Sequence, residues 1–70
     1  MSEWPAVKAR RVLDALQRIG WVIVRTRGSH RRLARPGCKQ ITFAFHDSAE
    51  VGPAALRRIA RDSGLKPEDL

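Results

Sequence analysis

Apolar residues recur at helical spacing near the start of the chain. The stripe comprises Ala9, Val12, Leu13, Leu16 and Ile19. Residues three and four positions apart share one side of a helix, so the stripe predicts an amphipathic helix over roughly 6–19. We expect Pro5 or Ala6 at its start and Gly20 just past its end, because proline suits the first helical turn and glycine the left-handed conformation that stops a helix.

A second stripe of apolar residues lies near the other end of the chain, at Leu56, Ile59 and Ala60. It predicts a second helix, for which Pro53 fits an early position and Gly64 the stop. The hydrophobic residue after Gly64 is expected to fold back onto the last turn, and a short tail follows.

The segment between the two helices has the pattern of strands. Residues 21–26 are β-branched and aromatic, residues 30–35 are mixed, and residues 40–45 alternate between apolar and other side chains. Gly28-Ser29 and Pro36-Gly37 supply the turns between them. We therefore expect three strands joined by hairpins.

The resulting order is α-β-β-β-α, which predicts an α+β fold in one domain spanning residues 1–70. Hairpin connections make the three-stranded sheet antiparallel. Both helices are expected on one face of the sheet, and the other face is expected to be open to solvent.

Strand alternation predicts which side chains reach the open face. Leu33 should point toward the helices, which directs His30 and Arg32 outward, and His46 shares their side if the third strand extends that far. If Leu33 lies opposite Phe43, the Cβ atoms of the two histidines are roughly 5 Å apart, and a register shifted by two residues makes them diagonal at roughly 7–8 Å. A bulge near the Gly28 turn or near the end of the third strand would spoil this pairing.

Positive charge is concentrated in the first half of the chain. The net charge is +7, and residues 1–35 hold nine Lys and Arg side chains against two acids. Five arginines without a carboxylate fall within residues 25–35. Like charges at cross-strand distance repel, so a polyanion is the expected partner. The predicted RNA-contacting residues are Arg25, Arg27, Ser29, Arg31, Arg32 and Arg35.

His30 stands inside this basic segment. An imidazole can take up or release a proton near neutral pH, which a general acid or base acting on a phosphodiester must do. The first hypothesis is therefore a small ribonuclease, and its rival is a nucleic-acid-binding protein without catalysis. Each histidine also has a purely structural interpretation. His30 would be a surface histidine that caps a turn. His46 would be part of a turn formed by His-Asp-Ser, and for His46 this structural interpretation is the stronger one.

Other chemistry finds little support in the sequence. Cys38 is the lone cysteine, and with two separated histidines it makes a poor metal set. There is no phosphate-binding glycine loop and no cluster of carboxylates for magnesium, so we expect neither metal nor cofactor. The first residues do not combine a basic region with an apolar stretch, and the longest strongly apolar run is Trp21–Val24. We therefore expect neither a leader sequence nor a membrane span, and we expect a cytoplasmic protein.

Four motifs occur in order along nearly the whole chain. They are Leu16–Trp21 (L-x-x-x-G-aromatic), Arg25–His30 (R-x-x-G-S-H), the third-strand segment Ile41–His46, and Leu56–Leu65 (L-x-x-I-x-x-x-x-G-hydrophobic). In these motifs the chain resembles the HicA toxins of HicA–HicB toxin–antitoxin systems.

The resemblance implies a double-stranded-RNA-binding-domain-like fold and a metal-independent endoribonuclease that acts on mRNA. It also implies a HicB-type antitoxin that covers the active face. The catalytic histidine of the family corresponds to His30. From its chemistry and not from the resemblance, His46 is a second candidate catalytic residue, which could protonate the 5′-oxygen leaving group if it lies close to His30. The alternatives are a non-catalytic RNA-binding module and, less favoured because neither helix has a close helix-turn-helix partner, a DNA-binding protein.

Overall fold

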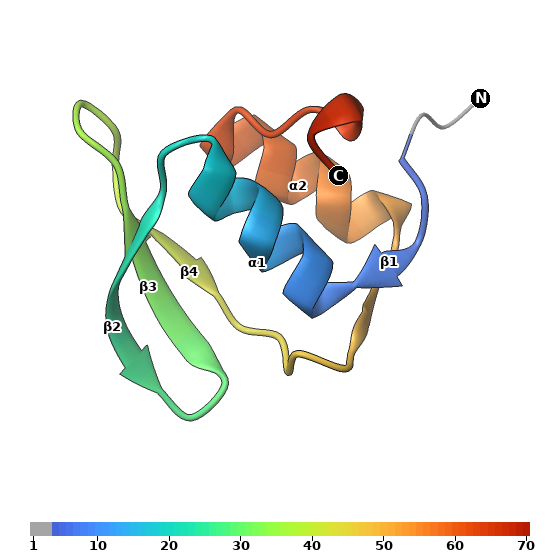
Figure 1. Ribbon diagram of the computed structural model, residues 1–70, viewed down its shortest axis with the longest axis horizontal. Helices are drawn as coiled ribbons and strands as arrows, with labels where there is room; N and C mark the ends of the chain where they lie inside the picture. Colours follow the sequence, from blue (N-terminus) through green and yellow to red (C-terminus); the bar gives the residue numbers. More distant parts are fainter. Residues whose placement is uncertain (1–3) are drawn as a thin grey trace.

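The computed structural model describes residues 4–70, so the first three residues of the expected 1–70 domain lie outside the described part. The elements, in chain order, are β1 (Val7–Lys8), α1 (Ala9–Arg18), β2 (Val22–Arg27), β3 (His30–Ala34), β4 (Ile41–Phe43), β5 (Glu50–Val51), α2 (Pro53–Ser63) and the 3₁₀ helix η1 (Pro67–Asp69). The expected α+β class is confirmed, and both helices lie on the same side of the sheet β2-β3-β4 (Figure 1).

The start of α1 differs from the expected one. Residues 7–8 form β1, which pairs antiparallel with β5, so the helix begins at Ala9 and the prediction of a start at Pro5 or Ala6 is wrong. The Ala9 N–H donates to the Ala49 carbonyl at 2.8 Å, which ties the first turn of the helix to the loop before β5. These two-residue strands are too short to show a period in sequence, and their pairing joins segments more than 40 residues apart.

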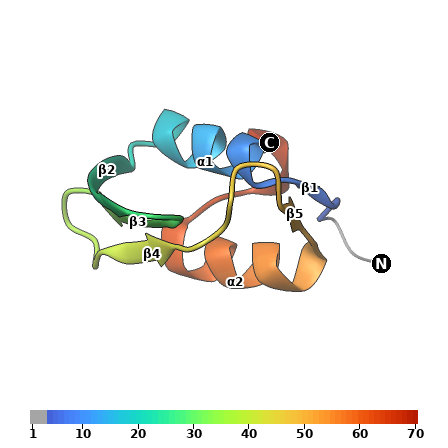
Figure 2. The ribbon, with the colours of Figure 1, turned by 90° about the horizontal axis from the view of Figure 1, so that it is seen from below.

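Side chains from the sheet and from both helices form one buried core. Figure 2 shows these elements from a second direction. Leu33 and Phe43 from the sheet belong to the same buried cluster as Leu16 of α1 and Leu56 of α2. Trp21 is also fully buried, and its indole N–H donates to the main-chain carbonyl of Ser63, at the end of α2, at 3.0 Å. This hydrogen bond satisfies the polar atom of a large apolar side chain and fixes α2 against the start of the sheet.

The sheet is antiparallel, in the order β2-β3-β4, as expected. Gly28 has a φ of +60°, and no non-glycine residue from Trp4 to Leu70 has a positive φ. A two-residue turn with positive φ at its first position alone is of type II′, so Gly28-Ser29 has the sequence that this hairpin requires. β4 ends at Phe43, shorter than the expected strand over 40–45.

The second helix follows the sequence closely. α2 begins with Pro53 in its first turn and is followed by Gly64, whose φ is +79°. Leu65 is buried behind it, as the expected stop motif requires. No helix in the part of the chain that the structure describes has the length and apolar character needed to cross a membrane.

Candidate nucleic-acid interface

A β-bulge in β2 decides which way the arginines of the first hairpin point. Ile23 pairs with Leu33, and the next pair along the strands is Arg25 with Arg32. β2 therefore holds one extra residue, Val24, between two pairs that are consecutive on β3. Val24 is 52% exposed, as expected for a residue left out of the pairing.

The bulge reverses the alternation of the rest of β2. Without it, Arg25 and Arg27 would share the face of Ile23 and point toward the helices. With it, Arg25 lies opposite Arg32, and Arg27 lies opposite His30. All four side chains consequently share the outer face of the sheet, which the helices leave open.

These side chains surround a shallow hollow on the outer face. Its volume is about 280 Å³. The lining residues are Arg25, Arg27, His30, Arg32 and Thr42. Three guanidinium groups that stay charged at any physiological pH meet here with one imidazole and no carboxylate. Such a set of donors suits the oxygens of a phosphodiester.

Thr42 is a member of this hollow that the sequence analysis did not assign to RNA contact. It lies opposite Arg32 across the β3–β4 pairing, and its side chain is exposed. The signal was present in the alternation of the third strand, because Thr42 stands between the inward-facing Ile41 and Phe43. Its hydroxyl can donate to a phosphate or accept from a ribose hydroxyl.

Arg31, predicted to contact RNA, lies on the other side of β3. Its Nη2 forms an ion pair with Oδ1 of Asp47 at 2.9 Å, and its side chain is 19% exposed. Asp47 is in turn tied to α1, since its carbonyl accepts from the Arg10 N–H at 3.1 Å. Arg31 thus joins the sheet to the loop between β4 and β5 and does not line the hollow with Arg32.

His46 is not brought together with His30 in the hollow. Leu33 lies opposite Ile41 and not opposite Phe43, so the register is the one shifted by two residues, in which His30 and His46 are not directly opposite. His46 lies three residues beyond the end of β4, where its carbonyl accepts from the Ala49 N–H at 2.9 Å. His46 therefore lies in a local turn, as its structural interpretation predicted.

The two remaining predicted contacts lie at opposite ends of the hairpin. Ser29 is in the turn directly before His30, close to the hollow in sequence but not among its lining residues. Arg35 follows β3 at the far end, where its guanidinium lies beside Gly20 and Gly64. Arg35 therefore borders the helix ends and not the hollow.

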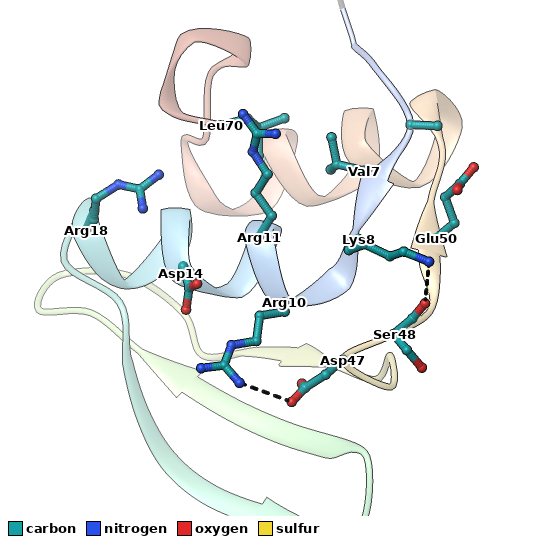
Figure 3. A pocket seen from close by; sticks show the side chains of 11 residues that line it. Val7, Lys8, Arg10, Arg11, Asp14, Arg18, Asp47, Ser48, Glu50 and Leu70 are labelled. Carbon is teal, nitrogen blue, oxygen red and sulfur yellow. Dashed lines mark hydrogen bonds and ion pairs between the residues drawn. The ribbon is translucent and has the colours of Figure 1, made fainter.

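A larger hollow, of about 1010 Å³, lies along the exposed side of α1 (Figure 3). It contains charges of both signs, and several are already paired. Lys8 Nζ donates to the Ser48 carbonyl at 3.2 Å, and Arg10 Nη1 lies 3.9 Å from Asp47 Oδ2. It has no imidazole, so it offers neither the uniform charge nor the acid–base group of the hollow around His30.

Metal-ligating side chains do not cluster in the described residues: from Trp4 onward, no three His, Cys, Asp or Glu residues are placed to hold one ion. Cys38 is exposed in the turn after β3. The hollow around His30 is lined by arginine, threonine and histidine side chains.

Comparison with known proteins identifies one family. Residues 9–65 match the model of the family described as the HicA toxin of bacterial toxin–antitoxin systems. No curated protein matches the chain as a relative. The matched range runs from the first residue of α1 to the buried leucine after α2, so it includes the whole sheet and the hollow on its outer face.

Proposed function

Because the chain belongs to the HicA toxin family, we propose that it is an endoribonuclease that cleaves mRNA at the hollow around His30 and needs no metal ion. One observation carries this proposal. Three arginines, one threonine and one histidine line a single open hollow that has no carboxylate among its lining residues. A phosphodiester placed there would have its charge compensated and a proton acceptor beside it.

The proposed reaction uses the ribose 2′-hydroxyl as nucleophile. Neutral His30 accepts the 2′-OH proton while that oxygen attacks the adjacent phosphorus in line with the 5′-oxygen. The bond from phosphorus to the 5′-oxygen breaks and leaves a 2′,3′-cyclic phosphate. The imidazolium then returns its proton, through water, to the departing 5′-oxygen.

The arginines would stabilise the charge that develops on the phosphorane oxygens. Arg32 is best placed for this task because it lies on the same strand and the same face as His30, two residues away. Arg25, opposite Arg32, and Arg27, opposite His30, would hold the phosphates on either side. Such fixed charges stabilise a transition state without reorganising during the reaction.

The family also supplies the partner: a toxin of a toxin–antitoxin system has an antitoxin, and we propose that it is of the HicB type. The toxin would act in the cytoplasm, where mRNA is translated. The arginines contact phosphates and not base edges, so binding is expected to depend little on RNA sequence.

A second candidate, a non-catalytic RNA-binding module, is favoured by one observation. The hollow contains a single imidazole, since His46 lies outside it. An RNA-binding surface needs only the arginines and Thr42, and it gains nothing from an acid–base group.

Incubation of the protein with a long single-stranded RNA in excess EDTA separates the two candidates. We expect cleavage, and we expect His30→Ala to lower the rate by about 10²–10⁴-fold, the usual contribution of a general acid or base. His46→Ala is the matched control and should keep most of the activity. RNA binding without cleavage by the unaltered protein would support the module, and a fully active, folded His30→Ala variant would refute the proposed mechanism.

A further inference from the structure

Another hollow lies between the free edge of β4 and helix α2. Its volume is about 200 Å³. Ile41, Phe43 and Phe45 line it from the strand side, and Ala55 and Ile59 line it from the helix. The two phenylalanine rings are 5.3 Å apart, and Phe45 is only half-buried. The floor of this groove is thus apolar and partly open to solvent.

The edge of β4 that borders the groove is unpaired. Within residues 4–70, β4 pairs with β3 alone, so the main-chain groups on its other side have no neighbouring strand. An edge strand of this kind accepts an added strand from another chain. Main-chain hydrogen bonds then supply affinity, and pockets for alternate side chains supply specificity.

Positive charge dominates one end of the groove. A further hollow of about 550 Å³ continues it along β4, and its lining includes Lys39, Gln40 and Arg61. Arg58 stands on the α2 wall. Asp62 is the one acid on the lining of either hollow, and it lies 3.9 Å from the Nε of Arg61. The groove therefore runs from an apolar end to a basic end.

These properties favour an extended protein segment over other occupants. Sites for drug-sized molecules occupy about 300–1,000 Å³, whereas the apolar part here suits one or two side chains. RNA would gain little from half-buried Phe45 and Ile59. A second copy of the chain would bring another Lys39 and Arg58 against the first, and like charges oppose such pairing.

The groove also adjoins the hollow around His30. Thr42 lines both, because its side chain points to the outer face while its backbone forms the edge of β4. A protein that occupies the groove is therefore in reach of the arginines on the outer face.

We propose that this groove binds an extended segment of the antitoxin, added as a strand along β4. The segment carries apolar side chains at alternate positions that enter the hollow at Phe43 and Phe45, followed by carboxylates that face Lys39, Arg58 and Arg61. This inference rests on the proposed function for the identity of the partner. It adds an anchoring site that is distinct from the surface that would cleave RNA.

The first test uses a substitution that fills part of the groove. In a His30→Ala background, Ala55→Leu places a larger side chain in the hollow, and Ala54→Leu makes the same change one residue away, where Ala54 is exposed and lines no part of the groove. We expect Ala55→Leu to weaken antitoxin binding at least tenfold, measured by calorimetry, and Ala54→Leu to leave it unchanged. Equal affinities for two variants that both fold, as judged by circular dichroism, would overturn the proposal.

The second test measures how charge at the groove affects antitoxin binding and whether main-chain hydrogen bonds form along β4. Arg58→Glu should weaken antitoxin binding by a similar factor, whereas Arg11→Glu, an equal change of charge on the exposed side of α1, should do so much less. Hydrogen exchange of the complex should show new protection of amides in residues 41–45. Absence of that protection would refute strand addition.

RNA cleavage, measured with His30 intact, distinguishes a failure of this proposal from a failure of the proposed function. Ala55→Leu and Arg58→Glu should both cleave RNA at the unaltered rate because neither residue lines the hollow around His30. If the protein cleaves RNA and binds the antitoxin but the groove variants bind normally, the groove proposal alone is wrong. If the unaltered protein does not cleave RNA, the proposed function is wrong, and the binding data still decide the groove.

Discussion

Arg31 and Arg32 are neighbours of the same chemical type with opposite surroundings. Arg32 is exposed on the outer face, beside His30 and Thr42. Arg31 faces inward, paired with Asp47, and its Nη1 is buried without a hydrogen-bond partner among the described residues. Both contribute one positive charge to the net charge, but of the two only Arg32 is exposed on the outer face, where a phosphate could contact it.

Substitution of each by alanine should separate these roles. Arg31→Ala breaks a partly buried ion pair, and we expect it to lower the free energy of unfolding by about 1–2 kcal/mol, between the values typical of exposed and buried pairs. In a domain of this size, 1 kcal/mol corresponds to roughly 4–8 °C in Tm. Arg32→Ala should barely change Tm but should weaken RNA binding. Thermal unfolding followed by circular dichroism, with RNA affinity from fluorescence anisotropy, measures both.

The reverse result would contradict this assignment. If Arg31→Ala lowered RNA affinity as much as Arg32→Ala without changing Tm, the ion pair with Asp47 would not describe Arg31 in solution, and the basic surface would extend to the other side of β3.

At the scale of elements, the bulge in β2 sets the composition of the candidate site. It leaves Val24 unpaired and brings Arg25 and Arg27 onto the face of His30. Bulges commonly redirect side chains near functional sites. A regular β2 would instead place Arg25 and Arg27 on the side of Ile23, away from His30.

The salt dependence of RNA binding should report which arginines the bulge brings to the outer face. Each phosphate contact on a single strand contributes about 0.7 to the slope of log affinity against log salt concentration. We expect Arg25→Gln and Arg27→Gln each to reduce the slope by about that amount. Arg35→Gln, the matched control beside Gly20, should leave it unchanged. Equal effects of all three would mean that binding follows net charge and not this face.

Much of the fold was predictable because the patterns that specify it are local. The helical stripes, the Gly64 stop and the alternation around Phe43 each depend on neighbouring residues, and all three are confirmed. The pairing of β1 with β5 and the ion pair between Arg31 and Asp47 were not predictable, since they join segments distant in sequence. The bulge at Val24 was not predicted because one extra residue in a run of β-branched residues does not change the type of residues in that run.

The same division applies to the candidate site. Gly28-Ser29 predicted the turn, and the parity of Leu33 correctly directed His30 and Arg32 outward. The position of His46 depended on where β4 ends, which the alternation from Ile41 to Phe45 did not reveal. Arg35 lies beside the ends of both helices, a tertiary contact that no local pattern of residues indicates.

At the scale of the whole molecule, two surfaces of different character meet at Thr42. The outer face of the sheet is basic and polar, and the groove along β4 is apolar with a basic end. In our proposals, RNA uses only the first of these surfaces, whereas the antitoxin uses both. If both proposals hold, the antitoxin should bind more tightly than RNA even though the same positive charge attracts both.

Antitoxin and RNA should therefore exclude each other. A net charge of +7 would attract an acidic antitoxin by electrostatic steering, and carboxylates over Arg25, Arg27 and Arg32 would occupy the positions that phosphates need. The measurement is a titration in which His30→Ala toxin holds fluorescently labelled RNA while the antitoxin is added. We expect RNA to be released in proportion to complex formation, and release to require more antitoxin for the Ala55→Leu variant. A stable ternary complex would show that the antitoxin inhibits through a surface other than the outer face.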